Sequence, residues 1–356
     1  MTTRIADDPA VDVRASSAGE DAERDRFVRG HPRGTVFHLA GWRRAVERAH
    51  GHGPRDLLAR RSGALAGVLP LMRCAGILPF AAADLVSVPY GVYGGPIGDS
   101  EDVQRALIAA AIALGRRERA GRVEFRCVED PHAEGLAPSA LYATFVRDLP
   151  TAVGDVMTRM PKRARAEVRK AIEQHGLELA EGPRFLPDLA RLFGESKQRL
   201  GSPGLPLAWF EALAAELGDG AVCHAAVRRG EVVAATMSFV FRETLTFYYI
   251  GTTAEANREF NATNFLTTRL QEWGVGRGLA RFDLSRSRVG TGSFSFKEHQ
   301  GFVPAPLAYR FALLSKRDLP ALTPSNPRTK ILRDTWTRMP GWVARSLSAR
   351  LSRYLP

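Results

Sequence analysis

Residues that could act on an anionic substrate follow a predicted strand at 280–284. Arg286 and Arg288 come directly after the strand, and a Gly-Thr-Gly turn separates them from Phe296 and Lys297. Reactive side chains often lie just beyond the carboxyl end of a strand, where an open crevice forms. Two guanidinium groups suit a phosphate or carboxylate, and an ammonium group can stabilise a carbonyl that is becoming an oxyanion. The alternative interpretation is a basic surface loop.

The composition is that of a folded protein with apolar cores. The chain has 356 residues, of which 45% are hydrophobic, so two domains fit the length. No run of about 18 apolar residues occurs, and the first residues are polar with mixed charge, so we expect neither a transmembrane helix nor a secretory signal. Cys74, Cys127 and Cys223 are far apart and odd in number. This favours reduced thiols in a cytoplasmic protein over disulfides or a zinc site.

The formal net charge is +12, and it is concentrated in two segments. Residues 316–356 hold nine Lys and Arg against two Asp, and residues 159–170 hold six Lys and Arg against Glu167. Such focused positive charge implies an anionic partner, which would be RNA, a phosphate-bearing substrate or acidic lipid. For 159–170, a solvated helix face explains the pattern equally well.

Two halves of the chain show a similar order of predicted elements. The first half predicts a helix at 39–50, strands at 56–61, 64–72 and 83–88, a helix at 102–119 and a strand at 123–128. The second half predicts strands at 221–228, 232–241 and 244–251, a helix at 262–274, a strand at 280–284, a short helix at 293–300 and a strand at 307–314. Helices at 153–175, 186–200 and 207–217 would join or decorate the halves.

This order predicts an α/β (α+β) fold, in which two mixed central sheets are each flanked by helices. We expect domains at 1–150 and 151–315, followed by a Pro- and Ser-containing linker and a basic helical tail at 316–356.

The tail has an amphipathic pattern. Val343, Leu347, Leu351 and Tyr354 fall on one helical face, with arginines opposite, and Trp336 and Trp342 lie nearby in sequence. A basic helix that contains Trp can lie in a membrane interface, where each cation contributes on the order of 1 kcal/mol on an acidic leaflet. Docking of this helix on its own domain is the alternative.

Several segments together resemble the Fem-type aminoacyltransferases, a branch of the GNAT superfamily with tandem acyltransferase-like domains. They are FHLAGWRRAVERAHG at 37–51, GVLPLM at 67–72, YGGPIGD at 93–99, RARAEVRKAIEQHGL at 163–177, NATNFLTTRLQEWGVGRGLARFDLSRS at 261–287 and GTGSFSFKEHQGF at 290–302. Their order and spacing are most similar to the Fem-like proteins of exosortase and exopolysaccharide systems. The resemblance implies two GNAT-like domains, with the transfer site in the second.

The resemblance also implies a chemistry. Family members move an acyl group, typically an amino acid from aminoacyl-tRNA, onto a primary amine, and a lysine in a Phe-Lys signature lies at the transfer centre. Phe296 and Lys297 match that signature, so Lys297 would stabilise the oxyanion and assist proton transfer to the leaving oxygen. Arg286 and Arg288 would bind phosphate or carboxylate groups. No cofactor is firmly implied, and the donor would be aminoacyl-tRNA, acyl-CoA or another acyl thioester.

The family also has a Gly-Pro-x-x-Asp turn, which the resemblance places on the acceptor side of the site, and residues 95–99 match it. Asp99 would contact the acceptor amine, and Tyr90 and Tyr93, which flank the turn, would line the acceptor cleft. Asp99 followed by Ser100 also fits the start of a helix as an N-cap. The implied acceptor is a primary amine of a cell-envelope, polysaccharide or peptide molecule, met in the cytoplasm or at the inner face of the membrane.

Two other functions fit parts of the sequence. A coenzyme A-dependent N-acyltransferase of a small molecule or sugar needs a glycine-rich loop before a helix to bind pyrophosphate, and the matching connection at 251–262 has a single glycine. An inactive GNAT-like scaffold would bind RNA or a membrane through the basic segments, with an affinity that falls steeply with salt. The sequence lacks P-loop, dinucleotide-binding, HExxH and GxSxG motifs, which argues against kinase, dehydrogenase, metalloprotease and serine hydrolase chemistry.

Overall fold

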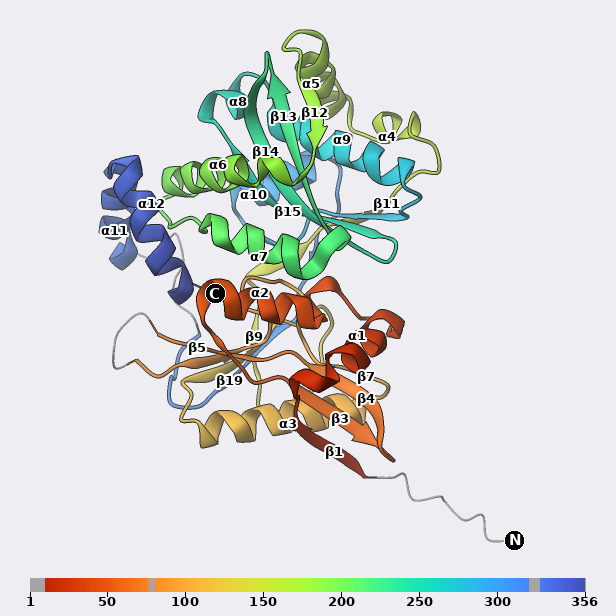
Figure 1. Cartoon of the computed structure of the whole chain (residues 1–356), viewed down its shortest axis with the longest axis vertical. Coiled ribbons are helices and arrows are strands. Elements are labelled where there is room, and N and C mark those ends of the chain that lie inside the picture. The colour runs from red at the N-terminus through yellow and green to blue at the C-terminus, as the bar shows by residue number, and fades with distance from the viewer. Residues whose placement is uncertain (1–9, 77–80, 320–326, 356) are drawn as a thin grey trace. The chain divides into compact units, whose positions relative to one another are not determined.

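The computed structural model describes residues 10–76, 81–319 and 327–355 (Figure 1). The chain forms two compact units. Unit 1 consists of Met1–Arg43, His52–Ser139 and Ala308–Leu319, and unit 2 consists of Arg44–Gly51, Ala140–Leu307 and Pro320–Pro356. The domains expected at 1–150, 151–315 and 316–356 remain a prediction about folding and function, which spatial compactness alone does not define.

Unit 1 contains two sheets and three helices among its described residues. The first sheet has the order β1-β3-β4-β7, with β1 at Val11–Ala15, β3 at Leu57–Arg61, β4 at Ala64–Leu69 and β7 at Ile97–Gly98. The second has the order β2-β5-β6-β8-β19-β9, with β2 at Gly53–Pro54, β5 at Met72–Cys74, β6 at Asp84–Val86, β8 at Arg122–Phe125, β19 at Tyr309–Leu313 and β9 at Ala137–Ser139. The helices are α1 (Asp21–Gly30), α3 (Glu101–Arg117) and the first residues of α2 (Ala40–His50).

The strand expected at 307–314 lies in unit 1, not at the end of the second half. Strand β19 pairs with β8 on one side, with Arg310 opposite Phe125, and with β9 on the other. The side chain of Tyr309 is buried, and its hydroxyl donates a 2.7 Å hydrogen bond to the carbonyl of Val92. Strand periodicity predicts that a strand exists, but the strands it pairs with depend on long-range packing. The pairing of β19 with β8 and β9 therefore does not follow from the local sequence.

Unit 2 contains a six-stranded sheet of the order β11-β16-β15-β14-β13-β12 and a small sheet of the order β17-β10-β18. The large sheet consists of β11 (Val146–Asp148), β16 (Arg281–Asp283), β15 (Thr244–Thr252), β14 (Glu231–Phe241), β13 (Ala221–Arg228) and β12 (Glu178–Glu181). The small one consists of β17 (Ser287–Arg288), β10 (Tyr142–Thr144) and β18 (Ala305–Pro306). The helices are α4 (Asp155–Thr158), α5 (Lys162–Glu173), α6 (Leu186–Arg199), α7 (Leu207–Leu217), α8 (Ala254–Arg258), α9 (Ala262–Gly276), α10 (Gly292–His299), α11 (Pro327–Arg338) and α12 (Gly341–Leu351).

In the large sheet of unit 2, the parallel strands β15 and β16 diverge after a short stretch of pairing. Strands β15 and β16 pair in parallel only over three residues, from Thr244 opposite Arg281 to Thr246 opposite Asp283. Strand β15 continues to Thr252, whereas the chain after Asp283 turns towards β17 and α10. Arg229 and Gly230 form the turn between β13 and β14, where both residues have positive φ, at 50° and 83°, as a tight hairpin requires.

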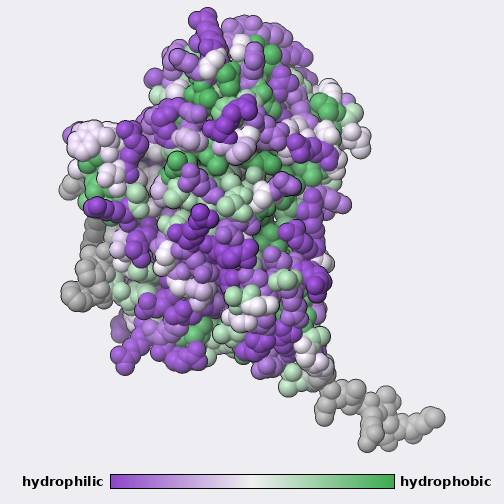
Figure 2. Space-filling view, viewed as in Figure 1, coloured by the Kyte–Doolittle hydropathy of each residue, from purple (hydrophilic) through white to green (hydrophobic). Residues whose placement is uncertain are grey.

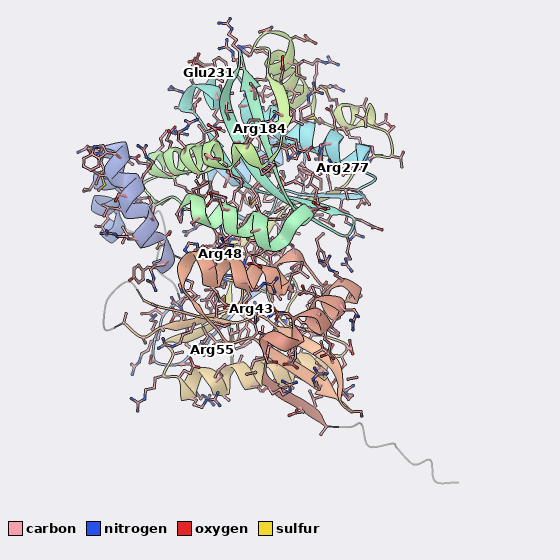
Figure 3. The ribbon with its side chains drawn as sticks, in the orientation of Figure 1. Arg43, Arg48, Arg55, Arg184, Glu231 and Arg277 are labelled. Atoms are coloured by element: carbon pink, nitrogen blue, oxygen red, sulfur yellow. The ribbon has the colours of Figure 1, made fainter. Side chains whose placement is uncertain are left out.

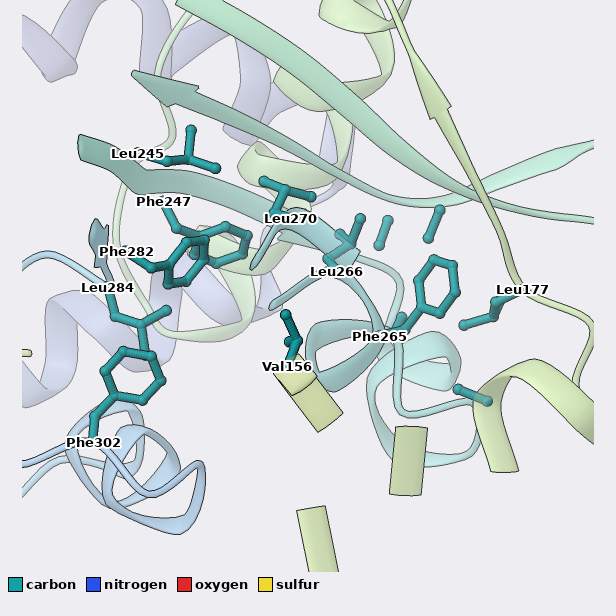
Figure 4. Close-up of a cluster of buried hydrophobic side chains, with 14 of the residues drawn as sticks. Val156, Leu177, Leu245, Phe247, Phe265, Leu266, Leu270, Phe282, Leu284 and Phe302 are labelled. Atoms are coloured by element: carbon teal, nitrogen blue, oxygen red, sulfur yellow. The ribbon is translucent and has the colours of Figure 1, made fainter. Parts of the chain in front are cut away.

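The core of unit 2 lies between the large sheet and α9 (Figure 4). Helix α9 contributes Phe265, Leu266 and Leu270, and the strands contribute Phe247 and Phe282. Each of these side chains is buried. Full burial of such a side chain stabilises the fold by about 1.5–3 kcal/mol, so this cluster holds in place strand β16, at whose end the candidate site begins.

Two predicted elements are interrupted by proline. The helix expected at 153–175 is in fact α4 and α5, because Pro161 holds an extended ψ of 144° at the start of α5. The strand expected at 64–72 is β4 and β5, with Pro70 between them. Proline has no amide hydrogen, so it cannot donate the backbone hydrogen bond that a helix or a strand needs at its position. Helix α1 and strand β1 were not expected, since polar residues dominate that segment.

Cys74, Cys127 and Cys223 are buried free thiols, as predicted. Burial raises the pKa of Cys127 and of Cys223 to about 12. Among the described residues, no helix has both the length and the apolar character needed to cross a membrane.

Candidate active site

The candidate site begins where β16 ends. Ser285 has a left-handed backbone with φ of 61°, which turns the chain away from the sheet. The buried carboxylate of Asp283 accepts a 2.6 Å hydrogen bond from the amide of Ser285 and a 3.4 Å one from the hydroxyl of Thr144. A left-handed conformation is strained for serine, so these hydrogen bonds hold a turn that Ser285 would not adopt on its own.

Lys297 lies on α10 with its side chain buried against this turn. Its Nζ donates hydrogen bonds to the carbonyl oxygens of Ser285, at 2.9 Å, and of Arg286, at 3.1 Å. The Nζ also lies 5.1 Å from the centre of the Phe145 ring. An ammonium group has three N–H donors. Two of these N–H groups bond to backbone carbonyls of the turn, so the turn also sets the direction of the third.

Burial lowers the pKa of Lys297 to about 7, because the charged amine loses its hydration there. The negative charge of Asp283 raises this pKa, and the positive charge of Arg286 lowers it further. At neutral pH the amine is therefore present in both protonation states. A group with its pKa near the working pH is suited to general acid–base catalysis.

Arg286 lies within electrostatic range of two lysines. Its guanidinium stacks on Tyr142, with 4.6 Å from Cζ to the ring centre. The pKa of Lys197, on α6, is lowered first by burial and then by the charge of Arg286, which also acts on Lys297. Arg286 therefore lies near both Lys197 and Lys297, and we call these three residues, which come from separate segments of unit 2, the cationic cluster.

Lys197 was not predicted from the sequence. Its helix was expected at 186–200, but one lysine in a charged helix gives no signal of its own. It is half-buried, and its Nζ lies 5.2 Å from the ring centre of Phe193. Only the packing of α6 on β15 and β14 relates Lys197 to residues about ninety positions later in the chain.

Arg288 and Phe296 lie close to this cluster in the chain but are less enclosed. Arg288 is half-buried on β17, where it pairs with Tyr142 of β10. Its carbonyl accepts hydrogen bonds from the amide and the hydroxyl of Thr291, at 3.3 and 2.7 Å, which closes the turn before α10. Phe296 is half-buried and directly precedes Lys297. Their roles in binding substrate remain predictions.

Asp99 belongs to unit 1, where it lines a cavity of about 430 Å³ together with Glu23, Arg26 and His31. Ser100, not Asp99, is the N-cap residue of α3. The amide of Asp99 donates a 3.0 Å hydrogen bond to the carbonyl of Ala66, and its side chain is exposed. The helix start expected at Asp99-Ser100 is present, with Ser100 as its N-cap residue, and contact of Asp99 with an acceptor amine remains a prediction.

Tyr90 and Tyr93 are buried in unit 1. Tyr90 has φ of 62°, and its hydroxyl lies 3.0 Å from Nε2 of His52. The ring of Tyr93 packs edge-on against Phe37, with 5.7 Å between ring centres. The guanidinium of Arg126 donates hydrogen bonds to two carbonyls of the same loop. These contacts hold the loop in place, and a role of either tyrosine in lining an acceptor cleft remains a prediction.

A second cavity, of about 620 Å³, lies in unit 2 among α5, β12 and α9. It is lined by Ile172, Gly176, Leu177, Glu178, Leu179, Arg269, Glu272 and Trp273. Arg277, labelled in Figure 3, stacks 4.2 Å above the ring of Trp273, and both side chains donate hydrogen bonds to Glu181. None of the predicted site residues lines it. Within the described ranges, no group of three His, Cys, Asp or Glu side chains is placed to hold a metal ion.

Comparisons with known proteins identify the fold. Residues 158–298 match the family model described as an acetyltransferase (GNAT) domain, and this span includes Lys197, Arg286 and Lys297. The structure titled FemX has a TM-score of 0.62 at 13% identity, over 85% of this chain and 98% of that one. A tandem GNAT protein from the clavulanic acid biosynthesis pathway has a TM-score of 0.54 at 14% identity, over 85% and 98% of the two chains.

A third similar structure is the C-terminal domain of a putative lysylphosphatidylglycerol synthetase from Agrobacterium fabrum. Its TM-score is 0.52 at 15% identity, and the likeness covers 83% of this chain and 92% of that one. No curated protein sequence matches this chain. The predicted mixed α/β fold with tandem GNAT-like parts is confirmed.

The match of residues 158–298 to a GNAT acetyltransferase domain supports acyltransferase activity, and the likeness to FemX is one of fold. The narrower likeness to proteins of exosortase and exopolysaccharide systems remains a prediction.

Proposed function

We propose that this acyltransferase moves an acyl or aminoacyl group onto a primary amine, with Lys297 at the transfer centre. The observation that carries the proposal is the buried Nζ of Lys297, held by the carbonyls of Ser285 and Arg286 and with a pKa of about 7. The acceptor would be a primary amine of a cell-envelope, polysaccharide or peptide molecule, and the inner face of the membrane is the proposed place of reaction.

The hydrogen bonds of Lys297 support a proposed function for each protonation state. In the neutral amine, two N–H groups reach the two carbonyls and the lone pair remains to accept a proton. As the acceptor nitrogen bonds to the acyl carbon, its proton passes to Nζ, and the lysine becomes an ammonium group. That proton then moves to the leaving oxygen or sulfur as its bond to the acyl carbon breaks, which restores the neutral amine.

Arg286 and Lys197 provide positive charge for the donor. A guanidinium group is always charged and forms paired hydrogen bonds with phosphate or carboxylate. Negative charge that develops on the acyl oxygen would also be stabilised by this cationic cluster, which is fixed in position before reaction. Aminoacyl-tRNA and acyl-CoA both place phosphate groups and an activated carbonyl in one molecule, and the cluster suits either.

The exposed face of α5 supports aminoacyl-tRNA as donor. Lys162, Arg163, Arg169 and Lys170 are exposed there, whereas Ala164, Val168 and Ala171 are buried. A row of cations on one helix face suits the phosphates of a nucleic acid. Binding of tRNA through this face would weaken steeply as salt concentration rises.

A coenzyme A-dependent N-acyltransferase is the second candidate, favoured by the match of 158–298 to an acetyltransferase model. The two candidates differ in their donor. Isothermal titration calorimetry with acetyl-CoA and with charged tRNA, followed by mass spectrometry of an amine panel, distinguishes them. The donor that binds and yields the heavier amine product is the one the enzyme uses.

Substitution of Lys297 tests the transfer centre with either donor. Lys297→Ala is expected to lower turnover at saturating substrates by about 100-fold or more, the usual contribution of a positioned acid–base group. Lys170→Ala, on the exposed face of α5, is the matched control for loss of a lysine and should retain turnover with acetyl-CoA. Full turnover by Lys297→Ala would show that the proposal is wrong.

A further inference from the structure

Three large apolar side chains are exposed at one corner of unit 2. Leu200 is 72% exposed, Leu332 71% and Trp342 70%. They come from the C-terminal end of α6, from α11 and from the start of α12. Figure 2 shows pale and green side chains over α11 and α12, at the left of the view, with purple ones around them. We call these three residues the apolar corner.

Hydrogen bonding and close packing bring the three segments together. The amide of Gln198 donates a 2.6 Å hydrogen bond to the carbonyl of Met339, three residues before Trp342. Gly201, which follows Leu200, lies so close to α11 that an added Cβ would be 2.8 Å from the Cβ of Arg333. In Figure 1, α11 and α12 lie beside one end of α6.

The face of α12 that the sequence marks as apolar is directed towards the protein. Ala344 and Ser348 are buried, and Val343, Leu347 and Leu351 are half-buried. The hydroxyl of Ser348 accepts a 3.1 Å hydrogen bond from the amide of Gly204. The predicted alternative in which the tail helix docks on its own domain is therefore confirmed for this face, which leaves the other face of α12 outward.

The outward face is basic. Arg338, Arg345, Arg350 and Arg353 are exposed, and the exposed acidic residue in the same segment is Asp334. A guanidinium nitrogen of Arg345 would lie 3.4 Å from a Cβ added at Gly341, so its charge is held beside Trp342. The apolar corner and these arginines thus form one surface.

We propose that this surface docks the protein on an anionic phospholipid membrane. Trp favours the membrane–water interface, leucine enters the acyl boundary, and guanidinium groups pair with lipid phosphates. Two other occupants fit less well. Three side chains are far below the roughly 800 Å² per partner of a stable protein interface. The apolar corner has one aromatic ring, that of Trp342, whereas proteins that bind single-stranded nucleic acid stack successive bases on several rings. The proposal does not depend on the transfer chemistry.

Flotation of the full-length chain with phosphatidylcholine vesicles, with and without phosphatidylglycerol, tests this proposal. The wild type should bind only when phosphatidylglycerol is present. Trp342→Ser combined with Leu332→Ser should weaken binding at least tenfold, because two apolar side chains that the membrane would bury are lost. Arg345→Gln combined with Arg350→Gln should weaken it roughly fivefold for each cation. Val303→Ser, at another exposed apolar residue, and Arg163→Gln, at another exposed arginine, are the matched controls.

Tryptophan fluorescence provides a second, independent measurement. Trp42, Trp209 and Trp336 are buried and Trp273 is half-buried, so a blue shift on vesicles should come from Trp342. Trp342→Phe should still bind vesicles but lose this shift.

Three results would overturn the proposal. They are a shift that persists in Trp342→Phe, vesicle binding by the double variants equal to that of the wild type, and a dimer in sedimentation velocity that Trp342→Ser dissociates. The last result would assign the surface to a second copy of the chain. Transfer to a soluble amine by the Trp342 variants should be unchanged in every case, so failure here is distinguishable from failure of the proposed function.

Discussion

The carbonyl of Ser285 accepts a 2.9 Å hydrogen bond from the Nζ of Lys297. The serine is in a left-handed conformation that Asp283 supports, so this carboxylate helps to position the carbonyl that holds the amine. This relationship makes the catalytic proposal testable by pH as well as by loss of activity.

The pH dependence of kcat/KM should reflect the titration of Lys297. If the neutral amine is the base, the rate rises with pH and levels off above the pKa of about 7. Asp283→Asn keeps an oxygen that can accept from Ser285 but removes the charge that raises the pKa of Lys297, so the rise should move to lower pH. An unchanged profile would mean that Lys297 is not the titrating group.

Arg286→Gln should move the same profile in the opposite direction. The positive charge of Arg286 lowers the pKa of Lys297, so its removal favours the ammonium form and the rise should occur at higher pH. The KM for the donor should also increase, because the cationic cluster loses its guanidinium. Arg281→Gln, at an exposed residue that begins β16, is a control that should leave the profile in place.

The stability of the fold should depend on pH through Lys297. Its pKa is lower in the folded chain than the ordinary value of 10.5, so the unfolded chain binds more protons between these two values. The cost of the buried amine is fully present below about pH 7 and disappears as pH rises towards 10.5. Lys297→Met should therefore stabilise the fold by on the order of 1 kcal/mol or more near pH 6 and by less near pH 9.

Urea unfolding of the wild type and Lys297→Met at the two pH values measures this difference. A stabilisation that grows with pH would contradict the lowered pKa.

Gly251 on β15 should not tolerate a side chain. A Cβ there would lie 2.2 Å from the backbone nitrogen of Phe193 on α6, and backbone cannot move aside as a flexible side chain can. Gly251→Ala should cost about 1–3 kcal/mol of stability and displace the helix that carries Lys197. Gly194→Ala, also on α6 but with open space at the Cβ position, should be neutral or stabilising by up to about 1 kcal/mol. Thermal unfolding of both variants measures the contrast.

The sequence predicted the elements of unit 2 better than their partners. Strand and helix periods locate β13, β14, β15 and α9, because side-chain alternation is a local property. The Phe296-Lys297 pair was singled out by its order after a strand, and the structure places Lys297 in a buried, hydrogen-bonded position. Lys197 could not be found in the same way, since its proximity to Arg286 comes from the packing of α6 on the sheet.

Proline and long-range pairing account for the main differences. Pro161 divides the helix expected at 153–175, which local rules allow one to anticipate. The position of β19 follows from pairing with β8 and β9, which no local pattern reports. Tyr90 and Tyr93 are buried beside the glycine-rich turn, and their role in lining an acceptor cleft stays a prediction.

The late position of β19 in the chain has a consequence for biosynthesis. Unit 1 needs β19 between β8 and β9, so its second sheet stays incomplete until the ribosome has translated Leu313, long after the rest of that unit has emerged. Until then the edges of β8 and β9 that pair with β19 have no partner strand. A nascent chain that stalls before this point would expose these edges to pairing with any neighbouring strand.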